Sequence, residues 1–122
     1  MAIERAKQRI TFGRPIADRQ AIQWMLAESA MELEMARLLV YKTAWMFDNG
    51  MDARMEAAMV KATCPQVACS VIDRAIQIHG GLGVLKETRL GEMYWTSRIS
   101  KIAEGGTEVM KMTVAKELLN KK

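Results

Sequence analysis

The stretch that decides the fold is ADRQAIQWMLAESAMELEMARLLVYKTAWMFD, from Ala17 to Asp48. Small or apolar side chains recur along it in steps of four and three, which is the spacing of one face of an α-helix. This predicted seam consists of Ile22, Leu26, Ser29, Leu33, Ala36, Val40, Thr43 and Phe47. Other apolar residues, such as Trp24, Met35 and Met46, lie off the seam. We therefore expect a long helix that is apolar on more than one side and buried within a larger assembly.

Downstream of this stretch, turn residues separate three further helical segments. Asp48-Asn49-Gly50 predicts a helix stop, after which Asp52 can cap a second helix that runs to about His79. Pro65 falls inside this helix and should kink it or remove a hydrogen bond. The predicted seam of the second helix is Met55, Ala58, Ala62, Cys69, Ile72 and Ile76, and Gly80-Gly81-Leu82-Gly83 ends it.

Two shorter helices complete the prediction. They cover roughly Leu90 to Ala103 and Thr107 to Leu119, with Glu104-Gly105-Gly106 between them and fraying at Asn120-Lys121-Lys122. No stretch shows strand alternation of useful length. Two long and two shorter antiparallel helices predict an all-α four-helix bundle that forms a single domain over residues 1–122.

The amino-terminal segment reads differently from the rest. Met1 to Ile10 has no capping start and resembles the tail of a helix whose beginning is absent. Gly13 and Pro15 then break the helix, because proline disfavours helix at Arg14. We expect the chain to be a fragment of a longer protein.

The net charge of +4 raises the possibility of nucleic-acid or membrane binding. The densest basic run consists of Arg5, Lys7, Arg9, Arg14 and Arg19, interleaved with Glu4 and Asp18. No aromatics sit among these charges in the way that a base-stacking surface needs, so we expect no nucleic-acid partner, although a few arginines can meet phosphates of a small ligand. Without a long apolar span or a secretory segment, the sequence predicts a cytoplasmic or organelle-matrix protein with no membrane partner.

The residues that commonly bind metals are sparse. Cys64 and Cys69 fit neither a redox CxxC pair nor a zinc knuckle, and five residues apart on a helix their side chains diverge. His79 is the one histidine, so no metal site is expected. The 11 methionines fit flexible packing between helices.

Taken singly, the remaining motifs are weak. Gly80-Gly81-Leu82-Gly83 closes a helix, whereas a dinucleotide fingerprint follows a strand and opens a helix. Glu104, next to two glycines, reads either as a solvated surface carboxylate or as a base held in a cleft. Arg9 and Gln20 flank the Phe12-Gly13 turn and read alone as surface residues.

Taken in order, the motifs resemble a known family. They are RITFGRPIADRQ from Arg9, LAESAMELEMAR from Leu26, DNG from Asp48, AIQIHGGLG from Ala75 and IAEGGTEV from Ile102. Their order and separations are similar to those of the C-terminal domain of acyl-CoA dehydrogenases over essentially all 122 residues. This resemblance implies one part of a three-domain FAD enzyme that acts on acyl-CoA, assembles as a homodimer or homotetramer and passes electrons to an electron-transfer flavoprotein.

The resemblance also implies roles for individual residues. Glu104 matches the family's usual base, which removes the α-proton of the acyl thioester while a hydride leaves the β-carbon for the flavin. Contacts with the FAD of a neighbouring subunit are implied for Arg9, Phe12 and Gln20, and a second flavin-contacting segment for Gln77, Gly80 and Gly81. Arginine suits a diphosphate because its guanidinium fork pairs with phosphate oxygens.

Two departures from the family pattern stand out. Glu104-Gly105-Gly106 replaces the usual Glu-Gly-Thr, so the hydroxyl of Thr107 comes one position late. Trp95-Thr96 stands where the family commonly has an Arg-Asp pair. Three alternatives stay open: an acyl-CoA oxidase, a flavin monooxygenase, or a helical module whose role is association without catalysis.

Overall fold

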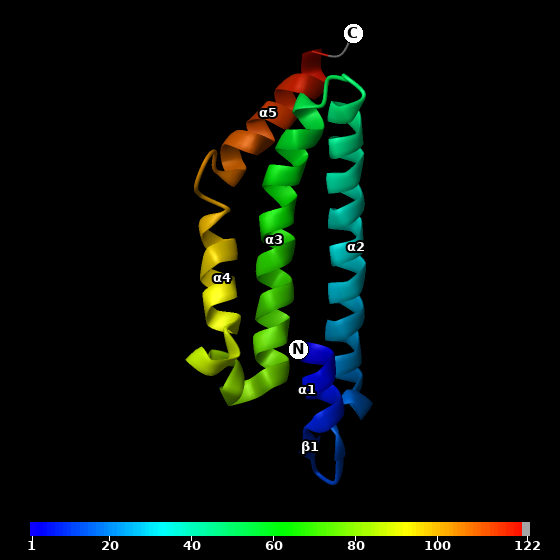
Figure 1. The fold of residues 1–122 in the computed structure, drawn as a ribbon, viewed down its shortest axis with the longest axis vertical. Coiled ribbons are helices and arrows are strands. Elements are labelled where there is room, and N and C mark those ends of the chain that lie inside the picture. Colours follow the sequence, from blue (N-terminus) through cyan, green and yellow to red (C-terminus); the bar gives the residue numbers. More distant parts are fainter. Residues whose placement is uncertain (121–122) are drawn as a thin grey trace.

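The computed structural model describes residues 1–120, and this part of the chain is almost entirely helical (Figure 1). The α-helices are α1 (Ala2–Gln8), α2 (Gln20–Asp48), α3 (Arg54–His79), α4 (Leu90–Ile99) and α5 (Thr107–Asn120). Short 3-10 helices cover Ile16–Asp18, Gly80–Val84 and Lys86–Thr88. Two very short strands, β1 (Ile10–Thr11) and β2 (Arg14–Pro15), pair antiparallel. The predicted all-α class is confirmed.

Several helix ends differ from the prediction. The long helix begins at Gln20 rather than near Ala17, because Ile16–Asp18 winds as a 3-10 helix and Arg19 is extended with ψ 125°. The first of the two shorter helices ends at Ile99 rather than near Ala103, and turn hydrogen bonds from Ile102 N and Ala103 N to the Ile99 carbonyl close it. Of the expected fraying at Asn120-Lys121-Lys122, residues 121–122 lie outside the described residues.

The turn between α2 and α3 follows the predicted stop. Gly50 adopts a positive φ of 67°, and the Asn49 side chain donates a hydrogen bond of 2.8 Å to the Trp45 carbonyl. Asp52 is not the N-cap of α3, since Ala53 holds that position. The Asp52 carboxylate still accepts the Arg54 N–H at 3.2 Å, and hydrogen bonds from the Arg54 side chain lower the pKa of Asp52 to about 2.

Helix α3 is the centre of the arrangement. It packs against α2 on one side, while α4 and α5 follow one another along the other side (Figure 1). In Figure 1, α2 runs up, α3 runs down, and α4 and α5 run up again. Helix α1 packs near the carboxyl end of α3. The antiparallel bundle is therefore built around α3, and α4 and α5 together take the place of one long helix beside it.

The buried face of α2 differs in part from the predicted seam. Leu33, Val40 and Phe47 were placed on it but are exposed, and their neighbours Glu32, Leu39 and Met46 are half-buried or buried instead. The remaining seam residues, from Ile22 to Thr43, are half-buried or buried as expected. A shift of one residue turns a side chain by roughly 100° around the helix, so a sequence apolar on two sides does not fix the contact face.

The core is small and is built mostly on α3. Its buried apolar residues there are Ala58, Ala62, Cys69, Ile72 and Ile78, while Met55 and Ile76 of the predicted seam are half-buried. The helix continues through Pro65, whose ring nitrogen has no hydrogen to donate. No helix among residues 1–120 is long and apolar enough to cross a membrane.

Large apolar side chains remain exposed along α2, as the sequence predicts. They include Trp24 (59% exposed), Met35 (63%), Leu38 (58%), Tyr41 (63%) and Trp45 (58%). Large apolar side chains exposed together along one helix are typical of contact with other protein. We refer to these five residues below as the α2 apolar face.

A charged pair joins α2 to α3 within the helical interface. The Arg74 guanidinium donates two hydrogen bonds of 2.7 Å to the two carboxylate oxygens of Glu32, and it lies 3.4 Å from a Glu28 oxygen. Both partners are partly buried, with side chains 20% and 29% exposed. The hydrogen bonds from Arg74 lower the pKa of Glu32. Such bidentate geometry fixes how the two helices face each other.

We expect Glu32→Gln to lower the free energy of unfolding by about 1 kcal/mol at pH 7, since the pair is still partly hydrated. Because the folded-state pKa of Glu32 is lowered, its contribution is fully present above the unfolded value of about 4.3 and is lost as pH falls through the folded value. Urea unfolding at pH 7 and pH 3 measures this. The difference between variant and parent should shrink at pH 3.

The matched control is Glu34→Gln, which removes the same charge from the exposed Glu34–Arg37 pair on the same helix. Its effect should stay within about 0.5 kcal/mol. Equal losses for the two variants would contradict a specific role for the Glu32–Arg74 pair.

Candidate functional site

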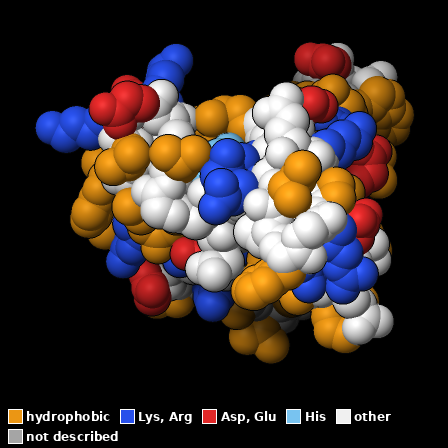
Figure 2. Space-filling model, turned by 90° about the horizontal axis from the view of Figure 1, so that it is seen from below, with side chains coloured by type: hydrophobic (Ala, Val, Ile, Leu, Met, Phe, Trp, Pro, Cys, Tyr) orange, Lys and Arg blue, Asp and Glu red, His pale blue; other side chains and the backbone are white. Residues whose placement is uncertain are grey.

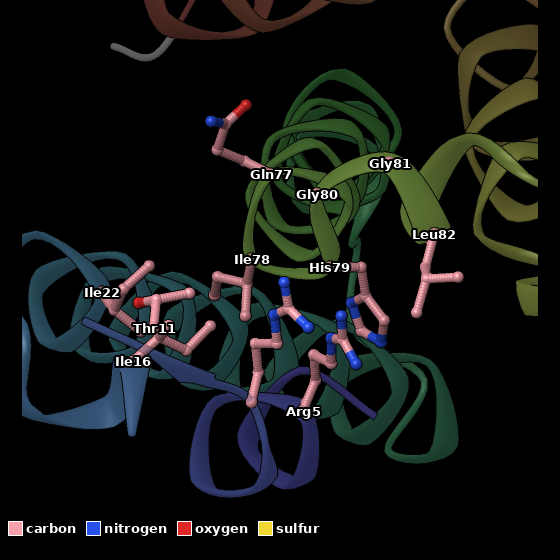
Figure 3. A pocket seen from close by; sticks show the side chains of 11 residues that line it. Arg5, Thr11, Ile16, Ile22, Gln77, Ile78, His79, Gly80, Gly81 and Leu82 are labelled. Atoms are coloured by element: carbon pink, nitrogen blue, oxygen red, sulfur yellow. The ribbon is translucent and has the colours of Figure 1, made fainter. Parts of the chain in front are cut away.

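A pocket of about 740 Å³ opens at the end of the molecule where α1, the β1–β2 hairpin, the start of α2 and the end of α3 meet. It is lined by Arg5, Arg9, Thr11, Ile16, Ile22, Gln77, Ile78, His79, Gly80, Gly81 and Leu82. Figure 3 shows side chains from α1, α2 and α3 around one space. The volume is within the range of small-molecule sites in proteins.

Four of the predicted FAD-contacting residues line this pocket: Arg9, Gln77, Gly80 and Gly81. Arg9 follows α1, whereas the other three lie about 70 positions later in the chain, at and just after the end of α3. The sequence placed them in two separate motifs, and the packing of α1 against α3 brings the motifs together.

The end of α3 is shaped by its glycines. Gly80 adopts a positive φ of 62°, which lets the chain leave the helix sharply. No atom lies within 4 Å of the Cβ position at Gly80 or Gly81, so a ligand can approach the backbone there. Gly83 is different, because a Cβ on it would lie 2.5 Å from the Ile76 carbonyl oxygen. The turn therefore packs tightly at Gly83 and stays open at Gly80 and Gly81.

The pocket is basic. Arg5 and Arg9 line it, and no Asp or Glu side chain among residues 1–120 does. Figure 2 shows Lys or Arg side chains (blue) beside a histidine (pale blue) near the middle of this end of the molecule. Arg5 Nε is buried without a hydrogen-bond partner among the described residues. A pocket with two guanidinium groups and open glycine backbone fits phosphate groups of a nucleotide cofactor.

The other two predicted FAD-contacting residues, Phe12 and Gln20, do not line the pocket. Phe12 is 95% exposed at the tip of the β1–β2 hairpin with a positive φ of 50°, and the Arg19 guanidinium lies 5.4 Å from the centre of its ring. Gln20 is the first residue of α2 and is exposed. Both side chains face away from this chain's own core, where another protein surface can reach them.

Glu104 lies in the turn between α4 and α5, away from the pocket (Figure 1). Its side chain is exposed, and its φ of 55° is in the left-handed region. A non-glycine residue adopts this conformation at a cost of about 1–2 kcal/mol, and such residues cluster at functional sites. Gly105 follows with a φ of 99°, so the turn presents the carboxylate on a sharply bent backbone.

The shifted threonine has an internal role. The Thr107 side chain is buried, and its hydroxyl donates a hydrogen bond of 3.3 Å to the Lys101 carbonyl. The Thr107 N–H donates to the same oxygen at 3.1 Å. These contacts hold the start of α5 against the end of the α4 segment, so the hydroxyl is directed inward in this chain.

Sequence reasoning missed Arg5 and His79 as pocket residues. Arg5 belongs to the densest basic run, and it precedes Arg9 by four positions, the spacing that puts two side chains on one helix face. The sequence indicates His79 as the end of a helix and as an isolated histidine without a metal site, but not as a residue of a ligand pocket. Among residues 1–120, no group of three His, Cys, Asp or Glu is placed to hold a metal ion, and both cysteines are free.

The all-α fold with a basic pocket at one end describes a helical domain suited to an anionic ligand. A family model described as the C-terminal domain of acyl-CoA dehydrogenase matches residues 1–119, and the chain belongs to this family. The chain is 44% identical to (R)-benzylsuccinyl-CoA dehydrogenase of Thauera aromatica, over 98% of this chain and 30% of that protein. It thus spans about a third of the length of the relatives it matches.

Solved structures show the same fold. Butyryl-CoA dehydrogenase from Megasphaera elsdenii superposes with a TM-score of 0.95 at 37% identity, over 98% of this chain and 31% of that one. The FAD complex of PigA superposes with a TM-score of 0.92 at 30% identity, over 96% of this chain and 30% of that one.

Proposed function

We propose that this chain is the C-terminal domain of a longer, three-domain FAD-dependent acyl-CoA dehydrogenase that catalyses α,β-dehydrogenation of an acyl-CoA thioester. The observation that carries the proposal is the basic pocket, which gathers Arg9, Gln77, Gly80 and Gly81 in a chain of this family. Its cationic lining and open glycine backbone fit the diphosphate and adenosine end of FAD. The flavin supplies the hydride acceptor of the reaction.

The remaining site residues serve two different flavin sites of the proposed assembly. Glu104 takes the α-proton of the thioester onto its carboxylate in a site that the rest of the enzyme completes. Since Glu104 lies apart from the basic pocket, one chain contributes the base to one flavin site and the diphosphate contacts to another. Phe12 and Gln20, exposed beside the pocket, extend the contact to the neighbouring subunit's FAD.

We propose a homodimer or homotetramer, with the α2 apolar face in contact with other protein of the assembly. Its exposed Trp24, Tyr41 and Trp45 side chains support this. An electron-transfer flavoprotein is the proposed electron acceptor, by resemblance to the family. The proposed compartment is the cytoplasm, or the mitochondrial matrix in a eukaryote.

The test compares this 122-residue chain with the longer flavoenzyme that contains it. We expect the 122-residue chain to show no acyl-CoA dehydrogenation with an artificial electron acceptor and to bind FAD weakly, because its pocket is open and Glu104 lies outside it. We expect the longer protein to carry FAD and to lose its flavin absorbance when acyl-CoA is added anaerobically. Turnover by the short chain would overturn the shared-site proposal, and a longer protein without flavin would overturn the proposed function.

A further inference from the structure

Arg5 is a pocket residue for which the proposed function has so far named no role. It lies on α1, its side chain is half-buried, and Figure 3 shows it extending from α1 toward the end of α3 near His79. Among the described residues, its Nε is the buried side-chain nitrogen or oxygen left without a hydrogen-bond partner. A buried donor that lacks a partner is costly, so this chain alone does not satisfy the hydrogen-bonding capacity of the Arg5 guanidinium.

Helix geometry pairs Arg5 with Arg9. The Arg9 N–H donates to the Arg5 carbonyl at 2.9 Å, which continues the helical hydrogen bonding and keeps both side chains on one face. Both side chains line the same pocket, and within the described part of the chain no side-chain carboxylate lines it with them. Two like charges repel at short range. A ligand that carries two negative charges attracts both guanidinium groups, and this attraction outweighs their mutual repulsion.

His79 completes the wall on the α3 side. Its Nδ1 lies 2.7 Å from the Ala75 carbonyl oxygen, and because a carbonyl only accepts, Nδ1 carries the hydrogen. This bond fixes the imidazole in the position shown in Figure 3, beside the Arg5 side chain. The wall is thus held in place before any ligand binds, which lowers the cost of ordering it.

We propose that Arg5 is a second diphosphate-binding residue of this pocket and acts with Arg9 on the same diphosphate. The inference rests on the proposed function and adds a residue to its cofactor site. A diphosphate is favoured over a single phosphate because its two charged groups match two guanidinium groups. The pocket volume of about 740 Å³ leaves room for the adjoining nucleoside. FAD and the nucleotide of coenzyme A both carry a diphosphate.

The experiment uses the longer flavoenzyme after removal of its flavin and compares Arg5→Gln with Lys7→Gln. Lys7 is exposed on the same helix and does not line the pocket. Lys7→Gln therefore removes the same charge as Arg5→Gln without changing the pocket. Dissociation constants are measured for FAD and riboflavin by flavin fluorescence, and for coenzyme A and inorganic pyrophosphate by calorimetry. We expect Arg5→Gln to weaken FAD about tenfold and leave riboflavin unchanged, because a charge-assisted hydrogen bond is lost only with the diphosphate ligand.

Each outcome decides the proposal. Unchanged affinity of Arg5→Gln for FAD, coenzyme A and pyrophosphate overturns it, and so does an equal loss of FAD and riboflavin, which indicates a structural role. A loss for coenzyme A alone supports the diphosphate role with that molecule as the source. Arg5→Lys, which keeps the charge without the planar fork, should give an intermediate loss and guards against misfolding of Arg5→Gln.

The proposed function and the role of Arg5 fail separately. If the unaltered longer protein binds no flavin, the proposed function fails. Pyrophosphate binding still tests Arg5 in that case, with an expected loss of about tenfold for Arg5→Gln and none for Lys7→Gln.

Discussion

Glu104→Gln in the proposed longer flavoenzyme is expected to slow flavin reduction by acyl-CoA by about 10²–10⁴-fold, with the FAD content unchanged. The amide has nearly the shape of the carboxylate and fits the same bent turn, but it cannot accept the α-proton. FAD content should hold because Glu104 lies outside the basic pocket. Stopped-flow measurement of flavin absorbance after anaerobic mixing with substrate gives the rate.

The matched control is Glu108→Gln, which removes the same charge from an exposed position four residues later, at the start of α5. It should reduce the rate less than twofold, since general-base catalysis depends on one positioned carboxylate. Unchanged flavin reduction in Glu104→Gln would show that the base lies elsewhere. Equal losses in both variants would point to the net charge of the turn.

Gly83→Ala is expected to lower the free energy of unfolding of the chain by about 2–3 kcal/mol, or roughly 10 °C in melting temperature. The added Cβ would lie 2.5 Å from the Ile76 carbonyl oxygen and 2.9 Å from the Ile76 Cα, both of them backbone atoms. Backbone cannot rotate away as a side-chain end can, so the turn at Gly80–Val84 must move. Thermal unfolding followed by circular dichroism measures the change.

Gly91→Ala is the control for this substitution. Gly91 lies inside α4, and no atom lies within 4 Å of its Cβ position. Because alanine is the better helix former, this variant should be at least as stable as the parent. A Gly83→Ala protein as stable as the parent would contradict the tight packing of the turn against α3.

Much of the fold follows from local sequence signals. The spacing of apolar residues and the Asn49-Gly50 and Gly80-Gly81 stops predict α2 and α3, since these signals act within one or two helical turns. The predicted start of α2 near Ala17 was wrong because Ile16–Asp18 winds as a 3-10 helix. Sequence periodicity does not distinguish such a segment from the first turn of an α-helix.

The site was predictable in its parts and not as a whole. Motif order singled out Arg9, Gln77, Gly80 and Gly81, and the structure places all four around one pocket. The spacing of four residues between Arg5 and Arg9 indicates that both side chains lie on one face of a helix. The sequence does not show that this face lies close to the end of α3. The roles of these residues, and of Phe12, Gln20 and Glu104, remain predictions for the experiments above.

The sequence by itself determined the helices, their turns and the family, because these depend on residues close together in the chain and on the order of short motifs. The tertiary structure decided which face of α2 is buried, that Arg5 and His79 join the basic pocket, and that Glu104 stands apart from it. The physical reason is that α2 is apolar on two sides and one residue turns the helix face by roughly 100°, so packing against α3 makes the choice.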